Sequence, residues 1–133
     1  MKKISLASLL SLTVLAFACT KDKDKSTSDK LQGKWYATTA QSNEHFSGQD
    51  HPESHSYAKG EATIEFKGAQ LYLNVQGSID TFPFIVLNDT TLLIDNAELL
   101  FLKKLTGSEL TTYTRYDSNS SDFGEETVNY NKY

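Results

Sequence analysis

Residues 62–87 read ATIEFKGAQLYLNVQGSIDTFPFIVL, and this stretch decides the fold class. Apolar and polar residues alternate through residues 62–66, a period of two that is typical of a β-strand with one face in the core. After Gly68 the same period resumes through residues 71–75. Because only a short break separates the two runs, they predict an antiparallel hairpin.

The rest of the folded segment carries the same kind of signal. Short runs rich in β-branched and aromatic residues are separated by turn residues, at residues 33–40, 79–87, 90–94, 98–105, 109–116 and 127–133. No segment combines an apolar period of 3.6 with the capping residues of a long helix. About eight short strands joined by tight turns predict an all-β protein, a small antiparallel up-and-down β-barrel.

The interior of such a barrel holds packed side chains or one small ligand. We expect bulky apolar residues at alternating positions to face this interior and to line any ligand space: Phe66, Leu73, Phe82, Phe84 and Phe101. So many bulky groups in so short a barrel predict that a cavity, where there is one, is small.

The first residues resemble a secretion signal. Two lysines precede residues 4–17, an uncharged apolar run that is short for a bilayer-spanning helix of about 20 residues. We therefore expect residues 1–18 to be a signal peptide and residues 19–30 to be a lipidated cysteine with a flexible charged tether. Residues 31–133 are expected to fold as one domain, since they are enough for one core and too few for two.

Cys19 is the only cysteine of the chain and ends the sequence LAFAC. This sequence resembles the lipobox of bacterial lipoproteins, in which the cysteine thiol is acylated. The resemblance implies a lipid anchor in the cell envelope, expected in the outer membrane, on its periplasmic face or at the cell surface. An ordinary signal peptide followed by an incidental cysteine is the alternative.

The charge balance argues against one class of partner. The formal net charge is −4, and removal of residues 1–18 takes it to −6 because two lysines are lost. A nucleic-acid-binding protein needs a clustered basic face, so we expect no nucleic-acid partner.

Gly33, Lys34 and Trp35 open the first expected strand. They are similar to the glycine–x–tryptophan motif of the lipocalins, and residues 31–116 as a whole resemble the compact lipocalin-like domains of Gram-negative lipoproteins. In lipocalins the tryptophan plugs the closed end of an eight-stranded barrel, and a late-strand arginine packs over it. The resemblance therefore implies that Gly33, Trp35 and Arg115 close the barrel, with an arginine–indole contact that stabilises it by about 0.5–2 kcal/mol.

The three histidines fall in residues 42–58, a polar segment after the first expected strand: His45, His51 and His55. His51 and His55 have the spacing that puts two imidazoles on one face of a helix, as zinc sites use. No apolar face supports a helix here, so we expect a solvated loop over the barrel mouth. A weak metal site or pH-sensitive site is the alternative, and no cofactor is expected.

The remaining polar residues form no recognisable catalytic set, so we expect the protein not to be an enzyme. The glycines, for example, occur singly at turns rather than in a phosphate-binding run. The first hypothesis is a lipocalin-like lipoprotein that binds a small hydrophobic or amphipathic ligand in the barrel mouth. The second is a protein-interaction module with a filled barrel that engages an envelope or extracellular partner through its loops.

Overall fold

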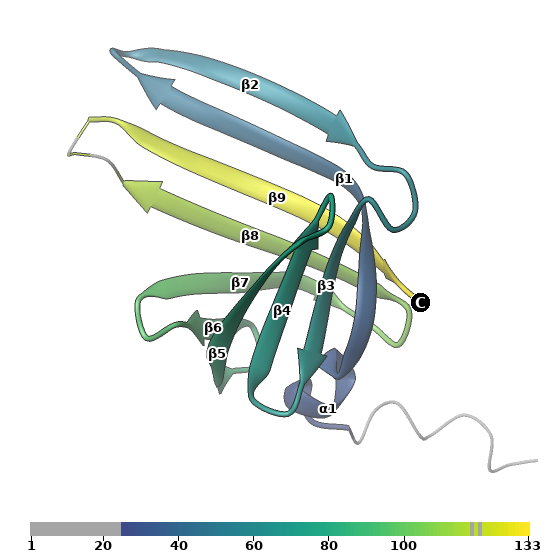
Figure 1. The fold of residues 1–133 in the computed structure, drawn as a ribbon. Helices are drawn as coiled ribbons and strands as arrows, with labels where there is room; N and C mark the ends of the chain where they lie inside the picture. The colour runs from purple at the N-terminus through teal and green to yellow at the C-terminus, as the bar shows by residue number, and fades with distance from the viewer. Residues whose placement is uncertain (1–24, 118, 120) are drawn as a thin grey trace, which may run out of the picture.

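The computed structural model describes residues 25–117, 119 and 121–133, and Figure 1 shows its fold. The expected signal peptide, Cys19 and the first part of the expected tether lie outside the described residues. In chain order the elements are α1 (Thr27–Leu31), β1 (Gly33–Phe46), β2 (Gln49–Ser56), β3 (Ala62–Lys67), β4 (Gln70–Val75), β5 (Ser78–Asn88), β6 (Thr91–Ile94), β7 (Glu98–Leu105), β8 (Glu109–Asp117) and β9 (Phe123–Lys132). Over these residues, no helix has the length and apolar character needed to cross a membrane.

Eight of the strands close into the up-and-down barrel that the sequence predicts. Strands β1, β3, β4, β5, β6, β7, β8 and β9 pair in this order, each antiparallel to the next, and β9 returns to pair with β1. The pairing within residues 62–87 is also as expected, since Ile64 lies opposite Leu73 and Leu71 lies opposite Phe82. The predicted all-β fold is confirmed.

Strand β2 lies outside the barrel and extends the nine-stranded sheet beyond it. Residues 33–36 of β1 pair with β3, whereas residues 39–46 pair with β2. Strand β9 pairs with both of these parts of β1, and β8 pairs with β9. Thus β2, residues 39–46 of β1, residues 123–129 of β9 and residues 111–117 of β8 form a sheet that projects beyond the barrel (Figure 1), which we call the distal sheet.

The sequence predicts a loop over residues 42–58, and this prediction is wrong. The end of β1 and the whole of β2 form a hairpin there. The two strands are joined at Ser47 and Gly48, whose φ angles of 52° and 77° suit a two-residue hairpin turn. Both faces of β2 are exposed, so its residues show no apolar alternation that would predict a strand.

The barrel interior is packed with side chains. Phe66 and Phe84 meet edge to face, with 5.3 Å between their ring centroids. The buried apolar core consists of Leu31, Trp35, Ala37, Ala40, Ala62, Ile64, Phe66, Leu71, Phe84, Leu92, Ile94, Leu100, Leu102, Leu110, Val128 and Tyr130. These residues come from the helix and from each barrel strand, so the core is continuous around the barrel.

Helix α1 covers the end of the barrel at which β1 begins, which we call the tether end (Figure 1). Leu31 is fully buried, and its carbonyl oxygen accepts a hydrogen bond of 2.8 Å from Trp35 Nε1. The side-chain amide of Gln32 bonds both the N–H and the carbonyl of Gly68 in the β3–β4 turn. Residues 27–30, which the sequence assigns to the flexible tether, are therefore helical and held against the barrel.

Candidate functional site

The five residues expected to line a ligand space lie in different environments. Phe66 and Phe84 belong to the packed core and are 1% and 5% exposed. Leu73 and Phe82 are partly buried on the inner face of β4 and β5. The sequence places Phe101 inside as well, but it lies on the outer face, where its ring is 6.0 Å from that of Tyr113.

The outward position of Phe101 follows from the alternation of β7. Leu100 and Leu102 are buried, so Phe101 between them faces the other way. The outer face also carries Leu99, which is 43% exposed. Because both faces of this strand hold apolar residues, the alternation is not visible in the sequence.

Trp35 is fully buried at the tether end, but the cation over its ring is not the predicted one. Arg115 lies in the distal sheet, where its guanidinium is 4.1 Å from the ring centroid of Phe123 and its Nε donates to Asp117. Instead, Lys132 Nζ lies 4.8 Å from the ring centroid of Trp35. The prediction that Arg115 covers Trp35 is wrong.

Strand pairing explains the place of Lys132. Trp35 and Lys132 are direct partners in the β1–β9 ladder, which closes the barrel. Gly33 has a φ of 111°, and a Cβ atom there would come within 3.3 Å of the Lys132 side chain. Glycine at this position therefore leaves room for the lysine stem beside the indole.

The β1–β2 hairpin keeps the three histidines apart. His45 Nδ1 lies 2.8 Å from Asp50, and its ring stacks on Phe123 with 5.1 Å between centroids. His51 and His55 share a face of β2, but the rise of four residue steps along a strand puts their Cα atoms about 13 Å apart. Within the described residues, no three His, Cys, Asp or Glu side chains are grouped so that they would hold a metal ion.

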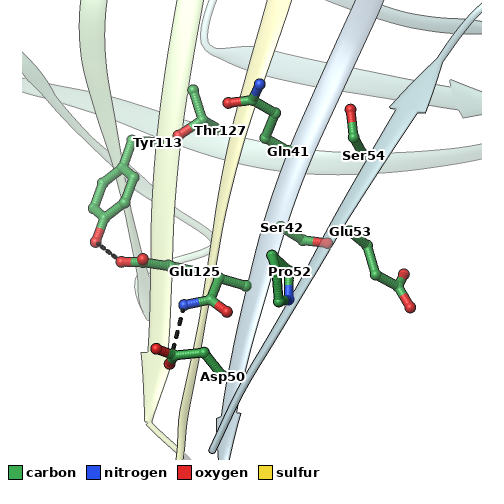
Figure 2. Close-up of a pocket in the computed structure, with 10 residues that line it drawn as sticks. Gln41, Ser42, Asp50, Pro52, Glu53, Ser54, Tyr113, Glu125 and Thr127 are labelled. Atoms are coloured by element: carbon green, nitrogen blue, oxygen red, sulfur yellow. Dashed lines mark hydrogen bonds between the residues drawn. The ribbon is translucent and has the colours of Figure 1, made fainter.

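A groove of about 580 Å³ crosses one face of the distal sheet. Figure 2 shows Tyr113 and Glu125 on one side of it and Pro52 and Ser54 of β2 on the other. Its lining residues come from all four strands: Gln41, Ser42 and Asn43 of β1, Asp50, Pro52, Glu53 and Ser54 of β2, Tyr113 of β8, and Glu125 and Thr127 of β9. Most of these side chains are amides, hydroxyls and carboxylates, so the groove suits a polar ligand.

Asn43 lies at the centre of this arrangement, opposite Pro52 on one side and Glu125 on the other. Its Nδ2 donates to Asp50 at 3.4 Å, which orients the amide because a carboxylate only accepts. The other end of the amide, Asn43 Oδ1, is buried and accepts no hydrogen bond from the described residues. A buried acceptor without a partner is unfavourable, and a donor from a ligand would relieve that penalty.

The two carboxylates of the groove differ in their surroundings. Hydrogen bonds from His45 and Asn43 lower the pKa of Asp50, so this side chain is ionised at neutral pH. Glu125 accepts a hydrogen bond of 3.0 Å from the hydroxyl of Tyr113, and this bond raises the pKa of the Tyr113 phenol. No lysine or arginine is among the lining residues, although two cations lie at the Tyr113 side of the groove: Lys103 Nζ is 4.6 Å from the ring centroid of Tyr113, and Arg115 is the direct partner of Glu125 in the β8–β9 ladder. The lining is rich in acceptors, so the groove favours a ligand that donates hydrogen bonds.

Sequence reasoning does not single out Asn43, Tyr113 or Glu125 as a site. Tyr113 and Glu125 lie on the consecutive strands β8 and β9, but Asn43 is far from both in the chain and meets them only because β9 also pairs with β1. Their residue types are common on exposed strands, so the sequence offers no signal that would distinguish them.

No protein-family model and no curated protein sequence matches the chain. Among solved structures, apocrustacyanin C1 is similar, with a TM-score of 0.46 and 12% sequence identity. The similarity covers 78% of this chain and 61% of that chain, so this chain spans less than two thirds of the length of apocrustacyanin C1.

Proposed function

We propose that this chain is a lipid-anchored, non-enzymatic binding protein of the cell envelope, in which the barrel is a scaffold and the distal sheet binds a basic segment of a partner protein. The observation that carries the proposal is the groove on the distal sheet. There Asp50 and Glu125 flank the buried, unpaired Oδ1 of Asn43. A lysine or arginine side chain supplies a donor for Asn43 Oδ1 and a positive charge between the two carboxylates.

The packed interior supports a role for the surface rather than for an internal chamber. Phe66 and Phe84, two of the residues expected to line a ligand, are in contact with one another and buried. A small ligand there would have to displace them. Of the two functions expected from the sequence, a filled barrel that engages a partner has the stronger support.

Acidic side chains gather at the end of the molecule that carries the groove. Away from α1, the strand ends and connections carry eleven of the fifteen acids in the described residues: Glu44, Asp50, Glu53, Glu61, Asp80, Asp95, Glu98, Asp117, Asp122, Glu125 and Glu126. Of the cations in the described residues, Arg115 lies at this end, whereas Lys59 Nζ lies 4.9 Å and 5.1 Å from the ring centroids of Tyr36 and Tyr133, beside Lys34. Such a field raises the rate at which a basic partner associates and disfavours an acidic one.

The test begins with a chain that starts at residue 19 and carries Cys19→Ser, because this chain contains every described contact of the barrel. It is applied to an array of short peptides of varied charge. We expect the retained peptides to carry lysine or arginine and their binding to weaken as salt is raised. Retention of neutral or acidic peptides to the same extent would contradict the proposal.

Two double variants with the same change in net charge separate the groove from the acidic field. In Asp50→Asn/Glu125→Gln, the affinity for a retained peptide should fall at least tenfold, because a hydrogen bond to a charged group contributes about 1.5–3 kcal/mol. In Asp80→Asn/Asp95→Asn, which lies outside the groove, the affinity should change little. Equal losses in both variants would show that only net charge matters and would rule out the groove as the site.

A further inference from the structure

A second hollow, of about 380 Å³, lies at the tether end of the molecule. It is formed where α1 meets the β5–β6 turn and the last residues of β7, and Thr27 Oγ1 donates to Asp89 across this junction. Four lysines are among its lining residues: Lys25, Lys30, Lys103 and Lys104. The acid in the lining is Asp89, so the hollow is basic.

The basic character extends over the whole tether end. Seven of the nine lysine and arginine residues in the described chain lie at this end: Lys25, Lys30, Lys34, Lys67, Lys103, Lys104 and Lys132. The acids there are Asp29, Glu65, Asp89 and Glu109, the last of which pairs with Lys104 at 2.7 Å. Because the opposite end is strongly acidic, the molecule has a pronounced charge polarity along the barrel.

We propose that the basic tether end docks on the anionic headgroups of the membrane that holds the lipid anchor. Charge complementarity argues for this surface, since each lysine near an anionic membrane adds to the attraction. The length of the chain before the described residues argues for it as well. The six residue steps from Cys19 to Lys25 span at most about 20 Å, so an anchor at Cys19 keeps the lysines close to the headgroups.

One apolar side chain at the same end fits the same surface. Leu87 is 51% exposed and lies two residues before Asp89, which lines the basic hollow. An exposed leucine beside lysines is the combination that interfacial segments use, with the apolar group below the headgroups and the charges among them.

Docking at the tether end fixes the orientation of the molecule. The distal sheet projects from the barrel away from α1 (Figure 1), so docking at the tether end holds this sheet and its groove away from the membrane. The acidic end is repelled by the same headgroups, which strengthens this orientation. The inference rests on the proposed lipid anchor, which brings the tether end to the membrane. The attraction between the lysines and anionic headgroups is measurable without the lipid.

The experiment uses the Cys19→Ser chain that starts at residue 19, so that binding by acylation is absent. Its co-sedimentation is measured with vesicles of phosphatidylcholine and with vesicles that contain about one third phosphatidylglycerol. We expect binding to the anionic vesicles only. The double variant Lys25→Gln/Lys30→Gln should weaken it about 25-fold, since each lysine contributes about fivefold.

The matched pair of single variants is Lys30→Gln at the tether end and Arg115→Gln in the distal sheet, each of which removes one positive charge. Lys30→Gln should weaken vesicle binding about fivefold, and Arg115→Gln should leave it unchanged or stronger. Circular dichroism checks that all the variants are folded. Equal binding to neutral vesicles, or equal loss in Lys30→Gln and Arg115→Gln, would overturn the inference. The inference would also be overturned if sodium phosphate released the protein from the vesicles and sodium chloride of the same ionic strength did not. The hollow would then be a site for a free anion. Peptide binding in solution is measured separately, so failure here and failure of the proposed groove are distinguishable.

Discussion

At the scale of single residues, the contact between Trp35 and Lys132 shows how the barrel base is held. The indole is fully buried, its N–H bonds the carbonyl of Leu31, and the Lys132 ammonium lies over its ring. Lys132 Nζ is also 3.4 Å from the carbonyl oxygen of Lys30. One lysine therefore connects the last strand to the helix and to the tryptophan.

We predict that Lys132→Met destabilises the protein by about 0.5–2 kcal/mol, because the cation over the indole is lost while the apolar stem is kept. Trp35 is the only tryptophan, so its fluorescence reports this contact directly. The emission of Trp35 should change in Lys132→Met and stay the same in Arg115→Met. If the emission changed only in Arg115→Met, the result would support the arginine–tryptophan contact that the sequence predicts and contradict the contact with Lys132.

Tyr130 is a second residue with a measurable signature. Burial raises the pKa of its phenol well above the ordinary value of about 10, although a hydrogen bond with Thr112 acts in the opposite direction. Above pH 10 the unfolded chain loses this proton while the folded chain keeps it. The folded state then binds more protons, so stability falls as pH rises above about 10.

We predict that Tyr130→Phe reduces this alkaline loss of stability. At neutral pH the variant should lose about 1 kcal/mol, because it lacks the hydrogen bond with Thr112. Some slope should remain, since the pKa of Tyr57 is also raised by burial. Urea unfolding followed by circular dichroism at neutral pH and above pH 10 measures the difference. Parallel pH dependence in the two proteins would show that Tyr130 is not responsible.

At the scale of elements, the β1–β2 hairpin depends on its turn more than on packing. Every residue of β2 is exposed, so little apolar burial supports it. The positive φ angles of Ser47 and Gly48 set the reversal that brings β2 beside β1. The turn also receives support from Asp122, whose carboxylate accepts from the Ser47 N–H at 3.2 Å.

We predict that Gly48→Val weakens the hairpin by at least about 1–2 kcal/mol, because a branched residue is strained in the left-handed region. Gly48→Asn is the matched control and should have a small effect, since asparagine tolerates positive φ. Amide hydrogen exchange should increase in β2 for the valine variant, while the protection of β4 stays the same. Equal exchange in the two variants would mean that the turn does not hold the hairpin.

At the scale of the whole molecule, the charge polarity and the distal groove fit the proposed lipid anchor in one arrangement. The described chain begins at the end of the barrel covered by α1, where most of the lysines lie, and most of the acids are at the other end. If both proposals hold, the membrane takes up the basic end and leaves the groove accessible.

We predict that Cys19→Ser removes the protein from the membrane fraction of cells that export it. Two acyl chains make attachment effectively stable, whereas the lysines alone give salt-sensitive binding. Fractionation after a high-salt wash, with an antibody to the folded domain, measures the difference. If the serine variant stayed in the washed membranes, the proposed lipid anchor would have to be abandoned.

The strands of the barrel core are predictable from the sequence because burial leaves a period of two. Ile64, Phe66, Leu71 and Phe84 show it, and their pairing in β3, β4 and β5 is as expected. The signal fails where both faces have the same character. Strand β2 is polar on both faces, so the sequence does not indicate it as a strand. Residues 98–105 are predicted as a strand, but β7 is apolar on both faces, so the sequence does not show that Phe101 faces outward.

The sequence by itself determines the fold class, since alternating apolar residues and short turns leave few arrangements other than antiparallel strands around one core. It also indicates a buried tryptophan at the start of the first strand. Only the tertiary structure decides which cation covers Trp35, because that depends on the β1–β9 register that closes the barrel. The same holds for the groove, where Asn43 and Glu125 become neighbours through pairing between strands from opposite ends of the domain. Contacts of this kind depend on long-range register, which local residue patterns do not record.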